Sequence, residues 1–461
     1  MDSANLLLLI KSFSKTEARD VRRFLASPFF NTREDLCQLF DFIYENENPQ
    51  KETAWQHLFP EKKYDDTAMR LLMSYLNRLL EKYLVFYENE EEPMRNKLKL
   101  AIAYRRRGLT GQYSRNLVAL EKQLENQSLR NGHYHQMMRD LAFEKQRTQT
   151  TSNPTDTANN REVIETTDVH YLATRMRLLC LEAAQKGVYR SKETEGTDRD
   201  IVALARQEKW AAHPAIGLYL RAYEMLTQPD NDGLYHQYKN LIIEAEAAFS
   251  SSEMKECYLF AINRCIRRLN EGNKAFGLEA IQLYRRALEG GFLLENGVLS
   301  RFTYHNIVGA ALATGELEWA RELIHQYKGQ LEKKYRESTF SFNLARLEMA
   351  VGSYGSVLEL LQKANYKDPL PNLAAKTLLL KTCYHLGEFD LLYSYLDAMR
   401  NYIHRSEVIG YHRTNYLNFI RYLDKLLQTN KSDNRAMEKL RQQIKNEKVL
   451  TESRWLLEMM A

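Results

Sequence analysis

Apolar residues recur along most of the chain with the spacing of an α-helix. Val21, Phe24 and Leu25 share one helical face, and residues 112–130 repeat an apolar residue on one face over several turns. Helix breakers are scarce, because the 461 residues include only 19 glycines and 9 prolines, about half the usual share. The pattern therefore predicts an all-α protein built from long helices.

The pattern of caps near the N-terminus predicts where two of these helices begin and end. Ser14 followed by Glu17 is a capping box, in which the Ser14 hydroxyl accepts from the Glu17 amide and the Glu17 carboxylate accepts from Ser14. Pro28 ends this first helix, because its ring disfavours the helical state of the preceding residue. Asn31 is a favoured N-cap with Glu34 three places later, so we expect the second helix to begin there.

Phe29 and Phe30 fall in the short turn between these two helices. Aromatic side chains bury large areas, so the first hypothesis is that both rings fill the gap between the helices. The alternative is that they bind a ligand.

The region around this turn resembles the N-terminal part of a family of helical-repeat proteins of Bacteroidota. The resemblance covers about the first fifth of the chain. It lies in Ser14 to Glu17, the turn from Ser27 to Asn31, Phe59-Pro60, Tyr64 to Asp66 and the helix from Met69 to Leu84. It implies a helical fold and carries no activity over.

Three similar turns recur further along the chain. They are Gly315-Glu316-Leu317, Gly352-Ser353-Tyr354 and Gly387-Glu388-Phe389, spaced by 37 and 35 residues, with Gly111-Gln112-Tyr113 as a possible degenerate copy. A period near 34 residues predicts a solenoid of helix pairs, in which each glycine ends the first helix in a left-handed cap.

The paired units resemble tetratricopeptide repeats. Small or aromatic residues expected in that repeat are present at Tyr304, Ala320, Ala345 and Ala364, and Pro369 stands where a helix stop is expected. Leu380 and Leu392 depart from the pattern, because small residues are usual at their positions.

Changes in composition divide the chain into five parts. We predict an N-terminal helical domain (1–87), a basic helical segment (93–147), a flexible polar loop (148–160), an irregular α-solenoid of tetratricopeptide-like helix pairs (161–405) and C-terminal capping helices (406–461). The acidic run 88–92 and Pro93 separate the first two parts, and a second polar loop is expected at 190–199.

The resemblance to tetratricopeptide repeats implies a concave groove lined by the first helix of each pair. Carried over to this chain, the groove contains His305, Leu312, Phe342, Arg346, Met349, Lys381 and Tyr384. Apolar anchors mixed with positive charge suit a protein or peptide partner with an acidic, amphipathic segment. The alternative is that Phe342 and Met349 belong to the core.

Charge is distributed unevenly in the first third of the chain. Residues 1–90 hold 12 basic and 15 acidic side chains, whereas residues 95–147 hold 12 basic and 4 acidic. The basic segment could contact nucleic acid through Arg105, Arg106, Arg107, Arg115 and Lys122. The net charge of +5 over the whole chain favours the protein-binding scaffold over this alternative.

The sequence contains no phosphate-binding loop, dinucleotide-binding glycine motif or His-Glu-x-x-His zinc motif. The pair His133 and His135 lacks further ligands at metal spacing, and the five cysteines form no Cys-x-x-Cys pair. We therefore expect a non-enzymatic protein without a cofactor or metal. The apolar run at residues 5–10 lacks a basic flank and is short for a signal peptide, so we expect a cytoplasmic protein.

Overall fold

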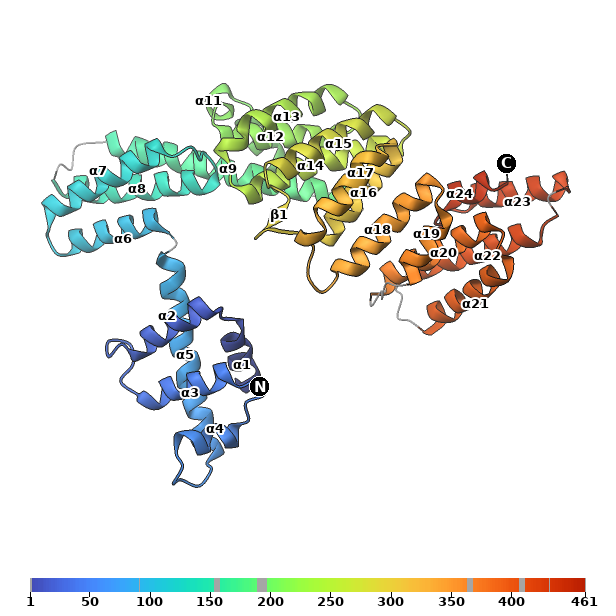
Figure 1. Cartoon of the computed structure of the whole chain (residues 1–461). Coiled ribbons are helices and arrows are strands. Elements are labelled where there is room, and N and C mark those ends of the chain that lie inside the picture. Colours follow the sequence, from blue (N-terminus) through green and yellow to red (C-terminus); the bar gives the residue numbers. More distant parts are fainter. Residues whose placement is uncertain are drawn as a thin grey trace. The chain divides into compact units, whose positions relative to one another are not determined.

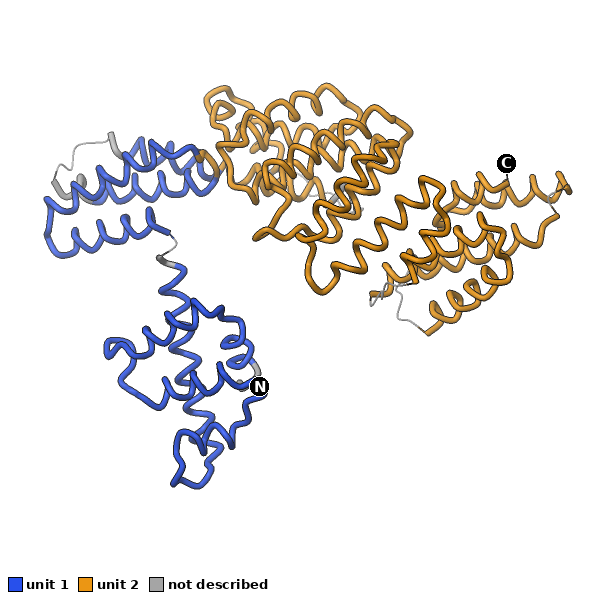
Figure 2. The backbone as a smooth tube through the Cα atoms, in the orientation of Figure 1, with its two compact units in different colours: residues 1–128, 132–171 blue, residues 129–131, 172–461 orange. Residues whose placement is uncertain are grey.

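The structure is a computed structural model that describes residues 2–90, 92–152, 158–188, 197–362, 368–405, 411–430 and 432–460. Its described part is all-α, as predicted, with twenty-four α-helices, two 3₁₀ turns and one two-residue β-hairpin. The chain divides into two compact units: residues 1–128 with 132–171, and residues 129–131 with 172–461 (Figures 1 and 2). No helix in the described part has the length and apolarity needed to span a membrane.

The first unit contains two separate hydrophobic cores. The first core lies between the helices α1 (Asp2–Ser12), α2 (Lys15–Ala26), α3 (Glu34–Glu45), α4 (Lys51–Leu58) and α5 (Asp66–Glu90). The second lies between α6 (Pro93–Arg106), α7 (Thr110–Asn126) and α8 (Gly132–Ser152). Each core can therefore form from a continuous stretch of sequence.

The first predicted cap is correct and the second is wrong. Ser14 and Glu17 form the expected capping box at the start of α2. Asn31, however, does not cap α3, which begins at Glu34 after Arg33. Its side-chain oxygen instead accepts from the Arg33 amide at 2.9 Å, and its amide nitrogen donates to the Leu25 carbonyl. Asparagine here closes a local turn, which competes with helix initiation.

The two phenylalanines of this turn have different environments. Phe30 stacks on Phe24 of α2 with ring centroids 4.2 Å apart and lies 6.1 Å from the Phe86 ring of α5, but it is still 37% exposed, so it fills the gap between the helices only in part. Phe29 is 88% exposed, so the packing hypothesis is wrong for this residue. Phe29 contacts only the edge of the Phe30 ring among the aromatic pairs of the described chain.

The polar stretch 148–160 is not a loop over its described length. Helix α8 continues to Ser152, and α9 (Ala158–Val188) already begins at Ala158, while residues 153–157 lie outside the described residues. A polar composition is compatible with a helix as well as with a loop, so composition alone did not distinguish the two. Of the second predicted loop, residues 197–199 belong to α10, and residues 190–196 lie outside the described residues.

The second unit continues as helices that pack mostly against their neighbours in sequence (Figure 1). Its first part contains α10 (Thr197–Ala205), α11 (Glu208–Ala211), α12 (Pro214–Thr227), α13 (Asp232–Ala245), η1 (Glu246–Ala248), α14 (Ser251–Asn270), α15 (Lys274–Glu289), β1 (Leu294–Glu295) and β2 (Val298–Leu299). Its second part contains α16 (Arg301–Thr314), α17 (Leu317–Gln326), η2 (Lys328–Gln330), α18 (Arg336–Val351), α19 (Tyr354–Gln362), α20 (Pro369–Leu386), α21 (Phe389–Arg405), α22 (Tyr411–Gln428), α23 (Asn434–Asn446) and α24 (Ser453–Glu458).

The predicted glycine caps are present at Gly315, Gly352 and Gly387. Each follows the first helix of a pair and has the left-handed backbone, with φ of 81°, 88° and 72°. Gly111 is not a further copy, because it lies in the first turn of α7, and Gly108 (φ 71°) is the left-handed residue there. Pro369 does not stop a helix but begins α20, where its missing amide costs no hydrogen bond.

Five of the residues singled out for the repeat pattern are fully buried in the described part of the chain. Tyr304, Ala320 and Ala345 are fully buried, and so are the two departures, Leu380 and Leu392. Ala364 lies outside the described residues. Leucine at the two departing positions therefore fills core volume between the helices.

Candidate functional site

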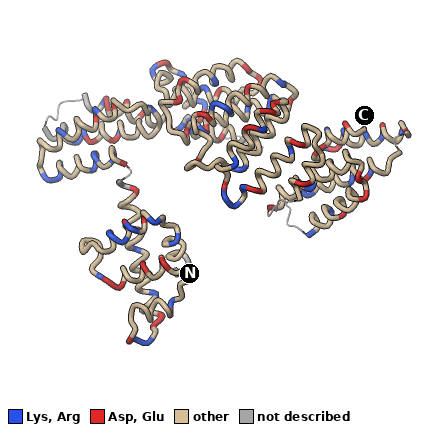
Figure 3. Tube along the Cα trace, in the orientation of Figure 1, with Lys and Arg blue, Asp and Glu red and all other residues tan. Residues whose placement is uncertain are grey.

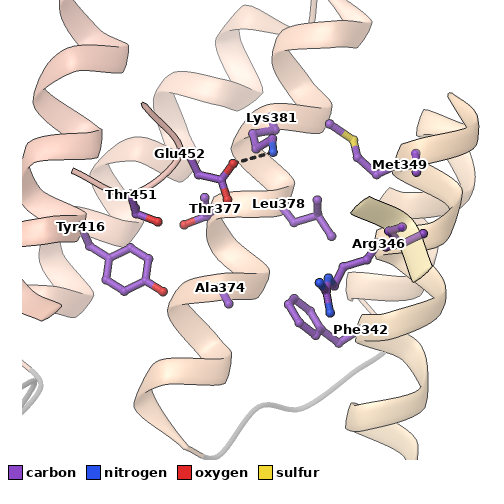
Figure 4. Close-up of a pocket in the computed structure, with 12 residues that line it drawn as sticks. Phe342, Arg346, Met349, Ala374, Thr377, Leu378, Lys381, Tyr416, Thr451 and Glu452 are labelled. Carbon is purple, nitrogen blue, oxygen red and sulfur yellow. Dashed lines mark hydrogen bonds and ion pairs between the residues drawn. The ribbon is translucent and has the colours of Figure 1, made fainter. Parts of the chain in front are cut away.

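A cavity of about 390 Å³ opens in the second unit between α18, α20 and the C-terminal helices (Figure 4). Five of the seven predicted groove residues line it: Leu312, Phe342, Arg346, Met349 and Lys381. The remaining lining residues were not predicted: Ala350, Ala374, Thr377, Leu378, Tyr416, Thr451 and Glu452. His305 and Tyr384 are not among the lining residues.

Helix α18 presents three of the predicted residues to the cavity. Phe342, Arg346 and Met349 follow one another at intervals of four and three residues, so they lie on one helical face. The neighbouring positions Ala345 and Leu347 are fully buried against adjacent helices. Burial of these two flanks fixes the rotation of α18 and therefore turns the three larger side chains toward the cavity.

Arg346 has polar neighbours but no ion pair with a carboxylate in the described part of the chain. Its Nη1 donates to the backbone carbonyl of His305 at 3.1 Å and to the Asn343 side-chain oxygen at 3.2 Å. The guanidinium carbon lies 5.8 Å from the centre of the Phe342 ring. Burial lowers the pKa of Arg346 from its usual value, and the Glu452 charge acts in the opposite direction. The cation is thus partly desolvated and is held by uncharged acceptors.

Gly309 makes room for this arginine on the neighbouring helix α16. A Cβ at Gly309 would lie 2.9 Å from Nη2 of Arg346, which is shorter than a van der Waals contact. The absence of a side chain at this position lets the guanidinium cross α16 and reach the His305 carbonyl. The position of Arg346 therefore depends on residues from two helices.

His305 supports the arginine from behind rather than lining the cavity. Its Nδ1 lies 2.8 Å from Nδ2 of Asn343, which is placed to donate to it. Burial lowers the pKa of His305 to about 4, and the positive charges of Arg346 and Arg301 act in the same direction. The imidazole is consequently neutral near neutral pH and accepts a hydrogen bond, as a positioning residue would.

Lys381 supplies a second cation, but it already has a partner within the cavity. Its Nζ donates to a carboxylate oxygen of Glu452 at 2.8 Å and lies 5.5 Å from the centre of the Trp455 ring. The side chain of Lys381 is 16% exposed and that of Glu452 is 35% exposed. Figure 4 shows this pair on α20 and the segment before α24, with Arg346 extending from α18.

Tyr384 packs behind the cavity against the C-terminal helices. Its ring meets Trp455 edge-on with centroids 5.5 Å apart and also approaches Phe389. The indole of Trp455 donates to Nε2 of His385 at 3.2 Å. Tyr384 therefore helps to attach α24 to α20, which places Glu452 beside Lys381.

The basic segment is less available for ligands than its sequence suggests. Nε of Arg105 donates to Glu144 at 2.6 Å, and the side chain of Glu144 is only 4% exposed, so this pair is part of the packing between α6 and α8. Arg106, Arg107, Arg115 and Lys122 are exposed and form no ion pair within the described residues. Figure 3 shows basic positions gathered where α6 ends.

The described residues contain no group of three or more His, Cys, Asp or Glu side chains that is placed to hold a metal ion. All five cysteines are free thiols, and four of them are buried. Comparison with known proteins found no matching family model, no matching curated protein and no matching solved structure.

Proposed function

We propose that this protein is a non-enzymatic scaffold that binds a protein partner through the cavity between α18, α20 and the C-terminal helices. The partner presents an acidic, amphipathic segment. The observation that carries the proposal is Arg346, a partly desolvated cation that has no carboxylate partner among the described residues and lies beside the apolar side chains Leu312, Phe342 and Met349.

Charge and shape both support a carboxylate ligand. A carboxylate placed against Arg346 would form charge-assisted hydrogen bonds, which are shorter and stronger than those to the neutral His305 carbonyl. The apolar residues supply anchors for a hydrophobic side chain of the same segment. A volume of about 390 Å³ accommodates one or two side chains rather than a folded domain.

The helix pairs support an extended interaction surface around the cavity. First helices α16, α18 and α20 each end at a left-handed glycine, as in units related to tetratricopeptide repeats. An irregular solenoid of such pairs would present its first helices along a groove. We place this role in the cytoplasm, because free buried thiols suit a reducing compartment.

A selection experiment tests the binding role. A display library of short random peptides is panned on the full-length protein, and the enriched peptides are measured by fluorescence anisotropy. We expect enriched sequences to combine Asp or Glu with apolar residues. Arg346→Gln should weaken their binding about tenfold or more, because the carboxylate loses its charged partner.

Arg321→Gln is the matched control for this experiment. Arg321 lies on α17 and pairs with Glu348 of α18 at 2.8 Å. The substitution therefore removes a cation near the same helix without changing a residue that lines the cavity. Its affinity for the selected peptides should equal that of the wild type. Selected peptides that lack acidic residues, or that bind Arg346→Gln unchanged, would refute the proposed site.

A second candidate function rests on the four exposed cations at the end of α6 and on α7. Arg106, Arg107, Arg115 and Lys122 have no carboxylate partner in the described residues, so they remain available to phosphates. This candidate is nucleic-acid binding by the basic segment. It omits Arg105, whose charge is already neutralised by Glu144.

A further inference from the structure

We propose that Glu452 is an internal competitor for the acidic ligand, occupying at Lys381 the place that a ligand carboxylate would take. This inference rests on the proposed binding function and assigns its regulation to one residue. Glu452 and Lys381 line the same cavity as Arg346, and their ion pair is 2.8 Å long.

The backbone at Glu452 is the first observation in favour. Glu452 has the left-handed conformation, with φ of 58° and ψ of 23°. Asn296 is the other non-glycine residue with positive φ in the described chain, and asparagine tolerates this conformation better than glutamate does. A disfavoured conformation is retained where surrounding interactions hold it, and it often accompanies a functional contact.

The position of Glu452 in α24 is the second observation. It occupies the N-cap of this helix, yet its side chain forms no capping hydrogen bond. Asp, Asn, Ser or Thr would serve better as a cap there. Neither the backbone conformation nor the cap therefore explains a glutamate at this position, whereas the contact of its carboxylate with Lys381 does.

Exposure decides which partner of the ion pair can leave. The Glu452 side chain is more exposed than that of Lys381, and it is carried by the turn before α24 rather than by the body of a long helix. Lys381 is fixed on α20 near Trp455. An incoming carboxylate can thus displace Glu452 and take over Lys381 while its other contacts form at Arg346.

Glu452→Gln tests the competition, because it keeps the shape of the side chain and removes its charge. The probe is an acidic peptide from the display selection, with the same peptide carrying Gln in place of its acidic residues as a reference. We expect Glu452→Gln to bind the acidic peptide about tenfold more tightly than the wild type, with no gain for the reference peptide.

Two further variants isolate the cause. In a Lys381→Gln background the gain from Glu452→Gln should disappear, because the released cation is then absent. Glu447→Gln is the matched control, since Glu447 lies in the same C-terminal segment and pairs with Arg421 away from the cavity. Its peptide affinity should remain at the wild-type value.

Glu452→Asn is the second test variant, because asparagine suits the left-handed backbone and removes the charge. It should bind the acidic peptide more tightly by the same factor. It replaces Glu452→Gln as the test if circular dichroism shows that Glu452→Gln folds poorly. Wild-type binding that depends on Arg346, together with unchanged or weaker binding in both Glu452 variants, would overturn the competition and leave the proposed function standing. No acidic-peptide binding by the wild type or by either variant would overturn both.

Discussion

At the scale of single residues, the cavity depends on a neutral histidine beside a charged arginine. His305 faces Asn343, and its backbone carbonyl accepts from Arg346. A proton on His305 would place a second cation next to Arg346 and would remove the acceptor used by Asn343. Burial therefore selects the neutral form, and the charged form is disfavoured by two separate contacts.

This environment predicts a pH dependence of stability. The unfolded chain takes up a proton on His305 below about pH 6.5, whereas the folded chain, with its pKa of about 4, does not. Stabilisation from neutral His305 is thus complete above about pH 6.5 and is lost progressively as the pH falls toward 4. The loss should amount to about 1 to 3 kcal/mol. Urea unfolding at about pH 7.5 and about pH 5 measures it.

His305→Gln should reduce the difference in unfolding free energy between these two pH values. Other histidines with lowered pKa values also contribute, namely His170, His213 and His385, so the comparison is between the variant and the wild type. His404→Gln, on the exposed surface of α21, should leave the difference unchanged. Equal pH dependence in all three proteins would argue against a buried neutral His305.

At the scale of elements, the glycine caps set where each first helix ends. Gly352 has φ of 88°, and a Cβ built on it meets no atom within 4 Å. Gly352→Ala should therefore cost only the backbone strain, about 1 kcal/mol, and Gly352→Asn should cost less. The shift in the midpoint of chemical unfolding measures both.

Gly355 provides the control within the same turn of the chain. It lies in the first turn of α19 without a positive φ, and a Cβ there is equally unobstructed. Gly355→Ala should cause no loss and up to about 1 kcal/mol of gain, because alanine has the higher helix propensity. Destabilisation of similar size in both alanine variants would contradict the left-handed cap.

Local signals account for the elements that the sequence predicts well. The Ser14 capping box and the three glycine caps depend on residues within a few positions of one another. The same local signals occur at Ser250 and Glu253, which form a capping box, and at Gly272, which follows α14 with φ of 98°. The predicted N-cap at Asn31 is wrong because an asparagine side chain can either close a turn or cap a helix. The hydrogen bond to the Leu25 carbonyl decides between the two.

The cavity shows where sequence prediction reaches its limit. The resemblance to tetratricopeptide repeats was sufficient to place Phe342, Arg346 and Lys381 at the cavity, because that pattern is local to each helix pair. Glu452 lies 71 positions beyond Lys381 in the chain, and its place depends on how Trp455 and Phe419 pack in the C-terminal core. No periodic pattern encodes that contact, so the competitor for the ligand site is visible only in the fold.

At the scale of the whole molecule, the two candidate functions lie in different units. They predict different effects of charge reversal on DNA binding. We compare Arg106→Glu/Arg107→Glu/Arg115→Glu with a control of equal charge change on exposed residues of α2, Lys15→Glu/Arg19→Glu/Arg23→Glu. Binding to a random-sequence DNA duplex is measured over a range of salt concentrations.

For a protein-binding scaffold, both triple variants should lower the weak attraction for DNA equally, because only the total charge matters. A dedicated nucleic-acid site would behave differently. The Arg106/Arg107/Arg115 variant alone would then lose binding, and the slope of log K against log salt would fall by about 3, one unit for each lost phosphate contact. Since Arg105 is held by the buried Glu144 and the exposed cations are few, we expect the equal response.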